Sequence, residues 1–489
     1  MVYSDATQSD IASCLANASA AFAHYRESSP QQRHQLLQAI AAQLQQVRDQ
    51  LVAVAMRETN LPAVRLHNEL NRTQFQLESY GAACEKGYWM EASLDVDERA
   101  QPAKPDLRKH LIPIGPVVVF GSSNFPFAYS TAGGDTASAL AAGCTVIVKA
   151  HPAHPETSAL AADCIHKAIE QCQLSPFIFQ HVVGASHQVG EWLVKHPATR
   201  AVAFTGSQLG GRQLFDWGAQ RPIPIPVFAE MGSVNPVFLL PEKLQQDATA
   251  IALQLAASYS LGVGQFCTKP GLIIGIESEA LRIFVTELRE ATIKMQPMPM
   301  LHAGIEKSYK EKSKKITEQA GVELLAQSNL SPNEGEGQPL VVQVNAANWL
   351  ANPLLHEENF GPFTALIVCK DLAEMITVAQ SLEGQLTGTV IATPAELPSF
   401  KPLIALLEDR CGRLIFNGVP TGVEVCKSMQ HGGPYPATTD ARFGAVGEDA
   451  IRRFIRPIAY QNWPDSQLPS SLQQSNPWKL PRFVNGQLE

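Results

Sequence analysis

A cysteine stands at position 267, between glycines and a proline in the segment GVGQFCTKPG. A glycine-rich loop leaves a thiol open to a substrate, although most free cysteines are buried as small apolar side chains. Glu230 ends an apolar run in FAEMGSVNP. Burial there raises the pKa of a carboxyl group toward neutrality and suits it to act as a general base, unless a neighbouring amide or cation pairs with it. Each segment alone leaves a catalytic and a structural role open.

A third polar side chain, Asn124, follows a strongly apolar run, in GSSNFPFA. A side-chain NH₂ beside a backbone N–H provides the two hydrogen-bond donors of an oxyanion hole. An asparagine in an N-F-P turn, however, is more often only a turn residue. Because Asn124 comes at the carboxyl end of a predicted parallel strand, we expect its amide to point into a ligand cleft.

Two other segments favour a dinucleotide ligand. In FTGSQLGG, Gly206 permits close backbone approach, and Ser207 either caps a helix or helps its N-terminal amides to bind a pyrophosphate. Lys149 ends another predicted strand, where it binds ribose or phosphate or is simply solvated. An acidic residue in the turn 150–152 would bind the adenosine ribose and repel a 2′-phosphate. The turn contains none, and this absence favours NADP over NAD as the cofactor. The candidate second cations for that phosphate are His151 and His187.

The apolar pattern predicts two α/β domains that position these residues. Between 111 and 230 short apolar runs alternate with helical stretches, as in a doubly wound parallel sheet, and the alternation begins again after Pro236. The predicted strands are 117–120, 145–149, 178–183, 201–205, 225–230, 271–276, 340–344, 364–369 and 413–417, and the principal helices are 131–142, 157–171 and 245–261. We expect a dinucleotide-binding domain (1–91 and 111–231, with 434–449 returning to it), a catalytic domain (232–433), a small β oligomerisation arm (92–110 and 450–465) and a C-terminal tail (466–489).

Composition excludes several classes of protein. The 489 residues are 45% hydrophobic and 17% charged, and the net charge of −8 offers no cationic surplus for nucleic acid. Nine scattered cysteines without a C-x-x-C pair form neither a disulfide framework nor a zinc site, so we expect no metal. The sequence has neither a leader peptide nor a run of about 18 apolar residues, so we expect a cytoplasmic protein with no membrane partner.

Six segments taken together resemble the aldehyde dehydrogenase superfamily over nearly the whole chain. They are, in order, SSNFP, KAHPAHP, FTGS, AEMGSVNP, GQFCTKPG and EENFGP. The resemblance implies that Cys267 is the nucleophile, Glu230 the general base and Asn124 the oxyanion-hole amide. It also implies five residues that contact the cofactor: Lys149, Gly206, Ser207, Glu358 and Phe360. Of these, Glu358 would face the nicotinamide ribose, and Phe360 would pack against the nicotinamide end of the cofactor. As isolated residues, Glu357 and Glu358 are otherwise a solvated acidic pair.

Three further segments resemble the 2,5-dioxovalerate (α-ketoglutarate semialdehyde) dehydrogenase branch: HPAHPETS, MQHGGPYPATT and AIRRFIRPIAY. This implies NADP-dependent, or alternatively NAD-dependent, oxidation of 2,5-dioxopentanoate to 2-oxoglutarate through a cysteine thiohemiacetal and thioester, in a homodimer or homotetramer. The branch is similar to NADP-dependent fatty aldehyde dehydrogenases, so a fatty or medium-chain aldehyde is the alternative substrate. The chain departs from the commoner superfamily patterns at Pro152, Met231, Ser233 and Phe266.

Three rival functions use the same residues. A Cys/His thiol hydrolase is disfavoured because no histidine stands out in a comparably glycine-framed motif, and because hydrolysis needs no dinucleotide. A coenzyme A-acylating dehydrogenase lacks a working base, which Glu230 supplies here. A catalytically silent dinucleotide-binding or structural protein has no reason to keep Cys267, Glu230 and Asn124 together.

Overall fold

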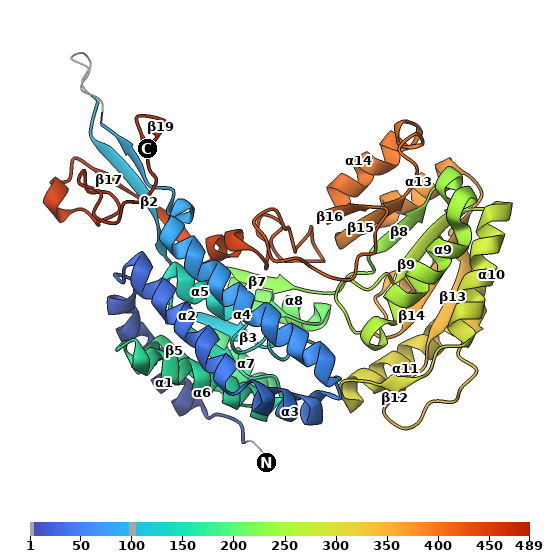
Figure 1. Ribbon diagram of the computed structural model, residues 1–489, viewed down its shortest axis with the longest axis horizontal. Helices are drawn as coiled ribbons and strands as arrows, with labels where there is room; N and C mark the ends of the chain where they lie inside the picture. The colour runs from blue at the N-terminus through green and yellow to red at the C-terminus, as the bar shows by residue number, and fades with distance from the viewer. Residues whose placement is uncertain (1–3, 97–103) are drawn as a thin grey trace.

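Two α/β domains lie side by side, and a small β arm with both parallel and antiparallel strand pairs extends from the first of them (Figure 1). The computed structural model describes residues 4–96 and 104–489. The first sheet is wholly parallel, in the order β5 (Phe179–Val182), β4 (Val146–Lys149), β3 (Val117–Phe120), β6 (Ala201–Thr205) and β7 (Val227–Glu230). Its carboxyl edge therefore collects Lys149, the segment after Phe120, the segment after Thr205, and Glu230.

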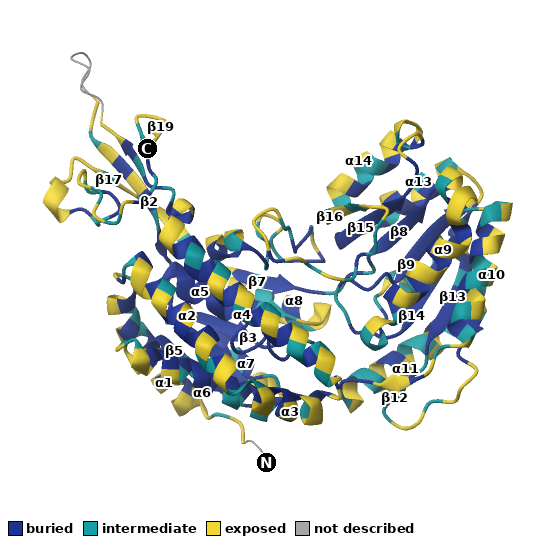
Figure 2. Ribbon diagram, viewed as in Figure 1, coloured by how far each residue is buried: buried dark blue, intermediate teal, exposed yellow. Residues whose placement is uncertain are grey.

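Helices cover both faces of this sheet, because its strands are apolar on both sides. In β3, Val117 and Val119 join one core with α2 (Pro30–Gln46), α4 (Ala63–Lys86), α5 (Gly134–Ala142) and α6 (Pro155–Gln171). Val118 joins the opposite core with α1 (Gln8–Tyr25), α7 (His187–Lys195) and α8 (Gln208–Ala219). Helix α3 (Arg48–Thr59) packs beside α4 and α6. Figure 2 shows the result, with buried strands and helices that expose only their outer stripe.

The second domain is built on a seven-stranded sheet. Its order is β11 (Val322–Gln327), β13 (Leu340–Asn345), β14 (Phe363–Cys369), β9 (Leu272–Ile276), β8 (Pro236–Leu239), β15 (Gln385–Ile391) and β16 (Cys411–Phe416), and only β11 runs antiparallel to its neighbour. Helices α9 (Pro241–Ser260) and α10 (Glu279–Ile293) cover one face. The other face is covered by α11 (Ala303–Thr317), α12 (Ala346–Ala351), α13 (Leu372–Ser381) and α14 (Lys401–Arg410). Strand β16 forms one edge of this sheet, and its residues are half-buried or exposed.

The arm is a five-stranded sheet in the order β17 (Ile455–Gln461), β2 (Leu107–Pro113), β1 (Ser93–Asp95), β18 (Phe483–Val484) and β19 (Gln487–Leu488). The segment 466–489, expected as an irregular tail, thus contributes two strands. It is tied down because Leu468 and Leu472 pack on Ala92 and Leu94, and because Arg108 forms an ion pair of 2.6 Å with Asp465. Part of the predicted arm, 97–103, lies outside the described residues.

The chain passes from the second domain back to the first through the irregular segment 417–447. There the backbone N–H of Met231 donates to Ala437 O at 2.8 Å, and Thr438 forms an isolated bridge with Glu230. Short elements complete the fold: η1 (Tyr88–Met90), η2 (Pro176–Ile178), η3 (Leu261–Gly264), β10 (Met298–Pro299), β12 (Glu336–Gly337), η4 (Pro353–His356), η5 (Leu397–Phe400), η6 (Glu448–Phe454) and η7 (Asp465–Gln467). Among the described residues, no helix has the length and apolar character to span a bilayer.

Candidate active site

The loop that carries Cys267 has an unusual backbone. It follows η3, where Gly262, Val263 and Gly264 all have positive φ, at 56°, 59° and 63°. A Cβ on Gly264 would lie 2.1 Å from the carbonyl oxygen of Gly361, so only glycine fits the close approach of the two chains. The Asn235 amide then donates to the carbonyl oxygens of Cys267, at 2.8 Å, and Lys269, at 2.9 Å. These contacts hold the thiol at a fixed place beside the first domain.

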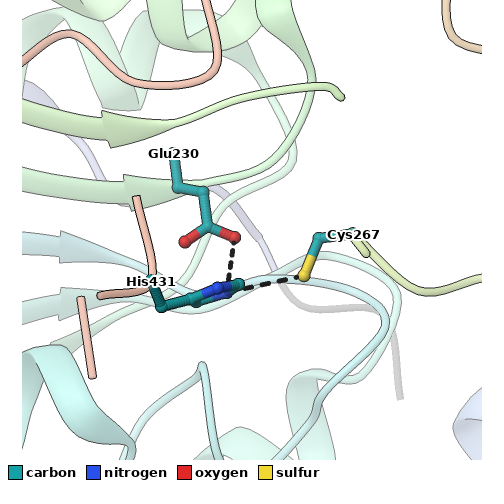
Figure 3. A group of neighbouring side chains, drawn as sticks. All are labelled: Glu230, Cys267 and His431. Carbon is teal, nitrogen blue, oxygen red and sulfur yellow. Dashed lines mark hydrogen bonds and ion pairs between the residues drawn. The ribbon is translucent and has the colours of Figure 1, made fainter. Parts of the chain in front are cut away.

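Two side chains from distant parts of the sequence, Glu230 and His431, lie beside this thiol (Figure 3). Glu230 ends β7, and its Oε1 lies 3.1 Å from Nε2 of His431. The same Nε2 lies 3.6 Å from Sγ of Cys267. Glu230 and His431 are 4% and 2% exposed, so the group is shielded from bulk solvent on the carboxylate side. The imidazole therefore stands between the thiol and the carboxylate, within proton-transfer reach of both.

His431 is the residue that sequence reasoning missed. It begins the run His-Gly-Gly in MQHGGPYPATT, so the argument that no glycine-framed histidine accompanies the cysteine was wrong. Its position depends on backbone contacts of an irregular segment: its carbonyl oxygen accepts from Ala445 N at 2.8 Å, and Gly433 packs against Gln385 O, where a Cβ would come within 2.1 Å. The glycines that follow the histidine were the available signal, because they indicate a close backbone approach.

The electrostatics of the site disfavour a free thiolate. Burial raises the pKa of Cys267 well above 9.0, and the charges of Glu230 and Glu358 raise it further. The thiol is therefore protonated at neutral pH and needs a base within reach before it can attack a carbonyl carbon. The contact with His431 Nε2 supplies such a base.

Asn124 also lies at the cysteine loop. Its Nδ2 donates to the carbonyl oxygen of Gln265 at 3.2 Å, two residues before Cys267, and the side chain is 7% exposed. Arg65 Nη2 donates to the Asn124 carbonyl oxygen at 2.7 Å. The structure thus brings the Asn124 amide, the Cys267 thiol and the Glu230 carboxylate into one region at the junction of the two domains.

Three of the predicted cofactor residues lie at the carboxyl edge of the first sheet. Gly206 and Ser207 are exposed at the start of α8, where Ser207 Oγ accepts from Gly210 N at 3.2 Å. The first N–H groups of a helix have no intrahelical partners, so this end can receive a phosphate. Lys149 ends β4 two strands away; burial lowers its pKa, and the charge of Asp5 opposes that shift. These residues fit the phosphate and ribose groups of a dinucleotide.

The two residues of the predicted acidic pair, Glu357 and Glu358, lie in different environments. Glu357 is exposed and forms an ion pair of 3.4 Å with Lys312. Glu358 turns inward: a Cβ on Gly232 would lie 2.6 Å from its Oε2, and burial raises its pKa while the Lys269 charge opposes the rise. Phe360 is half-buried two residues later.

The histidines considered as phosphate cations do not form a cationic group. Burial lowers the pKa of His151 well below 6.5, and its ring stacks on that of His154 with centroids 5.5 Å apart. His151 is therefore neutral at physiological pH, which removes it as a partner for a 2′-phosphate. His187 is the first residue of α7.

The three central side chains also resemble a metal-binding set. One ligand atom from each of Glu230, Cys267 and His431 lies within 4.8 Å of the other two. Sulfur, imidazole nitrogen and carboxylate oxygen are the donors that Zn²⁺ takes in proteins, with three protein ligands and one open position in many sites. The set can therefore hold a thiophilic divalent ion as well as act on a carbonyl group.

Known proteins of similar sequence and fold identify the family to which this chain belongs. The aldehyde dehydrogenase family model matches residues 1–444. An α-ketoglutaric semialdehyde dehydrogenase of Acinetobacter baylyi is 43% identical over 100% of this chain and 93% of its own length, and α-ketoglutaric semialdehyde dehydrogenase 2 of Azospirillum brasilense is 42% identical with the same coverage.

Solved structures share the fold at lower identity. A Thermus 1-pyrroline-5-carboxylate dehydrogenase with bound NAD gives a TM-score of 0.79 at 22% identity, covering 94% of this chain and 86% of its own. A 3,6-anhydro-L-galactose dehydrogenase in complex with NAP gives 0.77 at 23% identity, covering 94% and 92%. The chain therefore belongs to the aldehyde dehydrogenase family, whose members oxidise aldehydes with a nicotinamide dinucleotide.

Proposed function

We propose that this protein oxidises 2,5-dioxopentanoate to 2-oxoglutarate, with Cys267 as nucleophile, Glu230 as general base and Asn124 as oxyanion-hole amide. The observation that carries the proposal is the line of Cys267 Sγ, His431 Nε2 and Glu230 Oε1, with separations of 3.6 and 3.1 Å. The choice of aldehyde is supported by two full-length relatives, 43% and 42% identical, that are named for α-ketoglutaric semialdehyde, which is 2,5-dioxopentanoate.

Acylation begins with removal of the thiol proton. His431 Nε2 accepts the proton from Cys267, and the carboxylate of Glu230 stabilises the resulting imidazolium at 3.1 Å. The thiolate attacks the aldehyde carbon, and the oxyanion that forms accepts hydrogen bonds from Asn124 Nδ2 and the Cys267 N–H. A nicotinamide dinucleotide held by the residues proposed below would supply the acceptor for the hydride, and loss of that hydride as the carbon–oxygen double bond re-forms would leave Cys267 carrying a thioester.

Deacylation uses the same two bases. Glu230 Oε1 faces His431 Nε2 at 3.1 Å, whereas Oε2 has no hydrogen-bond partner among the described residues and is free to accept from water. Glu230 takes a proton from a water molecule that attacks the thioester carbon. The carbon–sulfur bond breaks, the carboxylic acid leaves as carboxylate, and the thiol is restored by a proton from His431.

We propose that Lys149, Gly206, Ser207, Glu358 and Phe360 contact the cofactor, and that NADP⁺ is preferred to NAD⁺. The β4–α6 turn offers no carboxylate to a ribose 2′-OH. Asp5 is the acidic group whose charge reaches Lys149. Asp5→Asn is therefore expected to raise the NADP⁺ to NAD⁺ ratio of kcat/KM, and an unchanged ratio would place the 2′-phosphate elsewhere.

The direct test of the function measures reduced nicotinamide by absorbance with 2,5-dioxopentanoate, a medium-chain aldehyde and either cofactor. Rapid reduction with the semialdehyde, abolished by Cys267→Ala, supports the proposal. A preference for the long apolar aldehyde would assign the fatty aldehyde alternative. If neither aldehyde reduced either cofactor although dinucleotide bound, the silent binding protein would replace the enzyme.

One observation favours a second activity of the same thiol. Because His431 lies 3.6 Å from Cys267, the pair resembles the Cys/His arrangement of thiol hydrolases, so the site can also cleave an activated ester without a dinucleotide. Hydrolysis of p-nitrophenyl acetate that is lost in Cys267→Ala and His431→Gln would show this activity.

We further propose a cytoplasmic homodimer or homotetramer that assembles through the arm. Strand β17 forms one edge of the arm sheet, where its unpaired backbone groups can join another sheet. Trp463, two residues beyond β17, and Phe483, on β18 toward the other edge of the sheet, leave apolar surface of the arm exposed, at 52% and 46%. All nine cysteines are free thiols, as suits a reducing compartment. Light scattering on the wild type and on a variant with proline at an outward position of β17 tests the assembly.

A further inference from the structure

We propose that Arg413 and Arg72 form the subsite that binds the carboxylate at the far end of a short semialdehyde substrate. This inference rests on the proposed function and deepens it, because it names the chemical class of substrate: an aldehyde with an anionic group a few carbons away. One arginine comes from each domain, so the subsite lies at the same junction as the thiol.

Arg413 lies on the edge strand β16, half-buried and close to the reacting sulfur. Its Nη1 lies 4.0 Å from Sδ of Met429, two residues before the His431 that contacts Cys267 Sγ at 3.6 Å, which places the guanidinium near the thiol. Burial lowers the pKa of the guanidinium, whereas the charges of ionised Cys267 and Tyr129 oppose that shift. Its Nη1 and Nη2 donate to the carbonyl oxygens of Gly422, at 3.0 Å, and Pro420, at 2.8 Å. These two contacts orient the guanidinium and leave other N–H groups for a ligand, since arginine has five.

Arg72 reaches the same backbone segment from α4. It donates to the carbonyl oxygen of Val423, the residue after Gly422, and lies 3.4 Å from the Tyr129 hydroxyl. The two guanidiniums therefore bind carbonyl oxygens of consecutive residues. Two fixed cations over one short backbone segment match the two oxygens of a carboxylate better than a single flexible lysine does.

The positive charge at this place is not neutralised by an ion pair. Among the described residues, neither Arg413 nor Arg72 forms an ion pair, and their guanidinium hydrogen bonds go to the carbonyl oxygens of the 420–423 segment, the Tyr129 hydroxyl and Met429 Sδ. The acidic group that faces Arg72 is Glu69, which accepts from the backbone N–H groups of Phe127 and Ala128. Burial raises the pKa of Glu69 to about 7, so it is partly neutral at physiological pH and the surplus of charge remains positive. A half-buried surplus of this kind attracts an anion.

Aromatic rings line the approach between these cations and the thiol. Phe125 packs edge-on against Phe266 and Tyr129, with centroids 5.5 and 5.2 Å apart, and Phe266 directly precedes Cys267. An apolar surface of aromatic rings can pack against the methylene groups of a substrate. A long alkyl chain would instead end against the guanidiniums and strip them of water without replacing their hydrogen bonds, which disfavours fatty aldehydes.

The experiment compares two aldehydes of the same length, 2,5-dioxopentanoate and pentanal, by the ratio of their kcat/KM values. Because a hydrogen bond to a charged group contributes about 10- to 100-fold, Arg413→Met is expected to lower the ratio by about that factor, and Arg72→Met likewise. Arg413→Lys, which keeps the charge, should recover part of the ratio. Arg289→Met, an exposed arginine of α10, is the matched control and should leave the ratio unchanged. An unchanged ratio in Arg413→Met would overturn the inference.

A second measurement does not depend on turnover. The dianion glutarate should protect Cys267 from iodoacetamide in the wild type, and protection should weaken at least tenfold in Arg413→Met. If glutarate gave no protection in the wild type, the subsite would be absent. If the wild type oxidised no aldehyde while glutarate protected the thiol through Arg413, the proposed function would fail and the anion subsite would stand.

Discussion

Replacing His431 by glutamine removes the base next to the thiol and keeps a polar side chain of similar size. Burial and the Glu230 charge raise the pKa of Cys267 well above 9.0, so less than about 1% of the thiol is ionised at pH 7 when no base assists. We therefore expect His431→Gln to lower the rate of acylation at pH 7 by at least about 100-fold. This agrees with the range of about 10²- to 10⁴-fold that general acid–base catalysis contributes.

The assay is alkylation of Cys267 by iodoacetamide as a function of pH, with stopped-flow measurement of the first turnover. In His431→Gln the alkylation rate should rise about tenfold per pH unit from pH 7 to pH 9, because hydroxide then replaces the imidazole. Thermal unfolding of each variant controls for loss of fold.

Glu230→Gln separates the two bases. It should keep a rapid first turnover and lose steady-state turnover, because the thioester forms but hydrolyses slowly. The reasoning would be refuted if His431→Gln alkylated and turned over like the wild type at pH 7, since the imidazole would then not be the group that ionises the thiol.

Three other outcomes follow from the structure. Gly264→Ala should destabilise the protein by about 2 kcal/mol or more in thermal unfolding, because φ is +63° and the new Cβ would overlap a carbonyl oxygen, whereas Gly335→Ala, with open space around it, should cost about 1 kcal/mol. Burial lowers the pKa of His110 from 6.5 to about 4, so the unfolded chain binds the proton first as pH falls; in urea titrations, His110→Gln should reduce the loss of stability between pH 7 and pH 5 by about 2 kcal/mol. Zn²⁺ should inhibit the enzyme reversibly, with recovery in EDTA and weaker inhibition in His431→Gln, and equal inhibition of both proteins would exclude imidazole ligation.

The fold followed from apolar runs wherever those runs were continuous. Strand β3 is entirely apolar and was predicted at its observed position, 117–120. Strand β15, Gln385–Ile391, was not predicted because its sequence, QLTGTVI, mixes threonine and glycine with the apolar residues. It is nevertheless buried along its length, since Thr387 donates to Asn235 Oδ1 at 3.0 Å and so satisfies its hydroxyl. Long-range hydrogen bonds of this kind leave no signal in local composition.

The site shows the same limit more sharply. Cys267 and Glu230 were candidates because each follows an apolar element and has a glycine within three residues, which is a local pattern. His431 lies 164 residues from Cys267 in a segment without regular structure, and only its tertiary contacts bring Nε2 to the sulfur. The arginines near Tyr129 were likewise hidden, because a cation's role depends on whether a carboxylate faces it in space.

The arrangement of domains explains why such a site sits at their junction. Glu230 ends a strand of the first sheet, Cys267 belongs to the second domain, and His431 lies in the segment that returns from the second to the first. A buried carboxylate with an oxygen that has no hydrogen-bond partner costs stability. At the junction, the His431 imidazole 3.1 Å from Oε1 and the backbone bridge between Glu230 and Thr438 offset part of that cost. The remaining oxygen, Oε2, is then the feature that deacylation requires, because a carboxylate whose oxygens are all satisfied by protein donors could not take a proton from water.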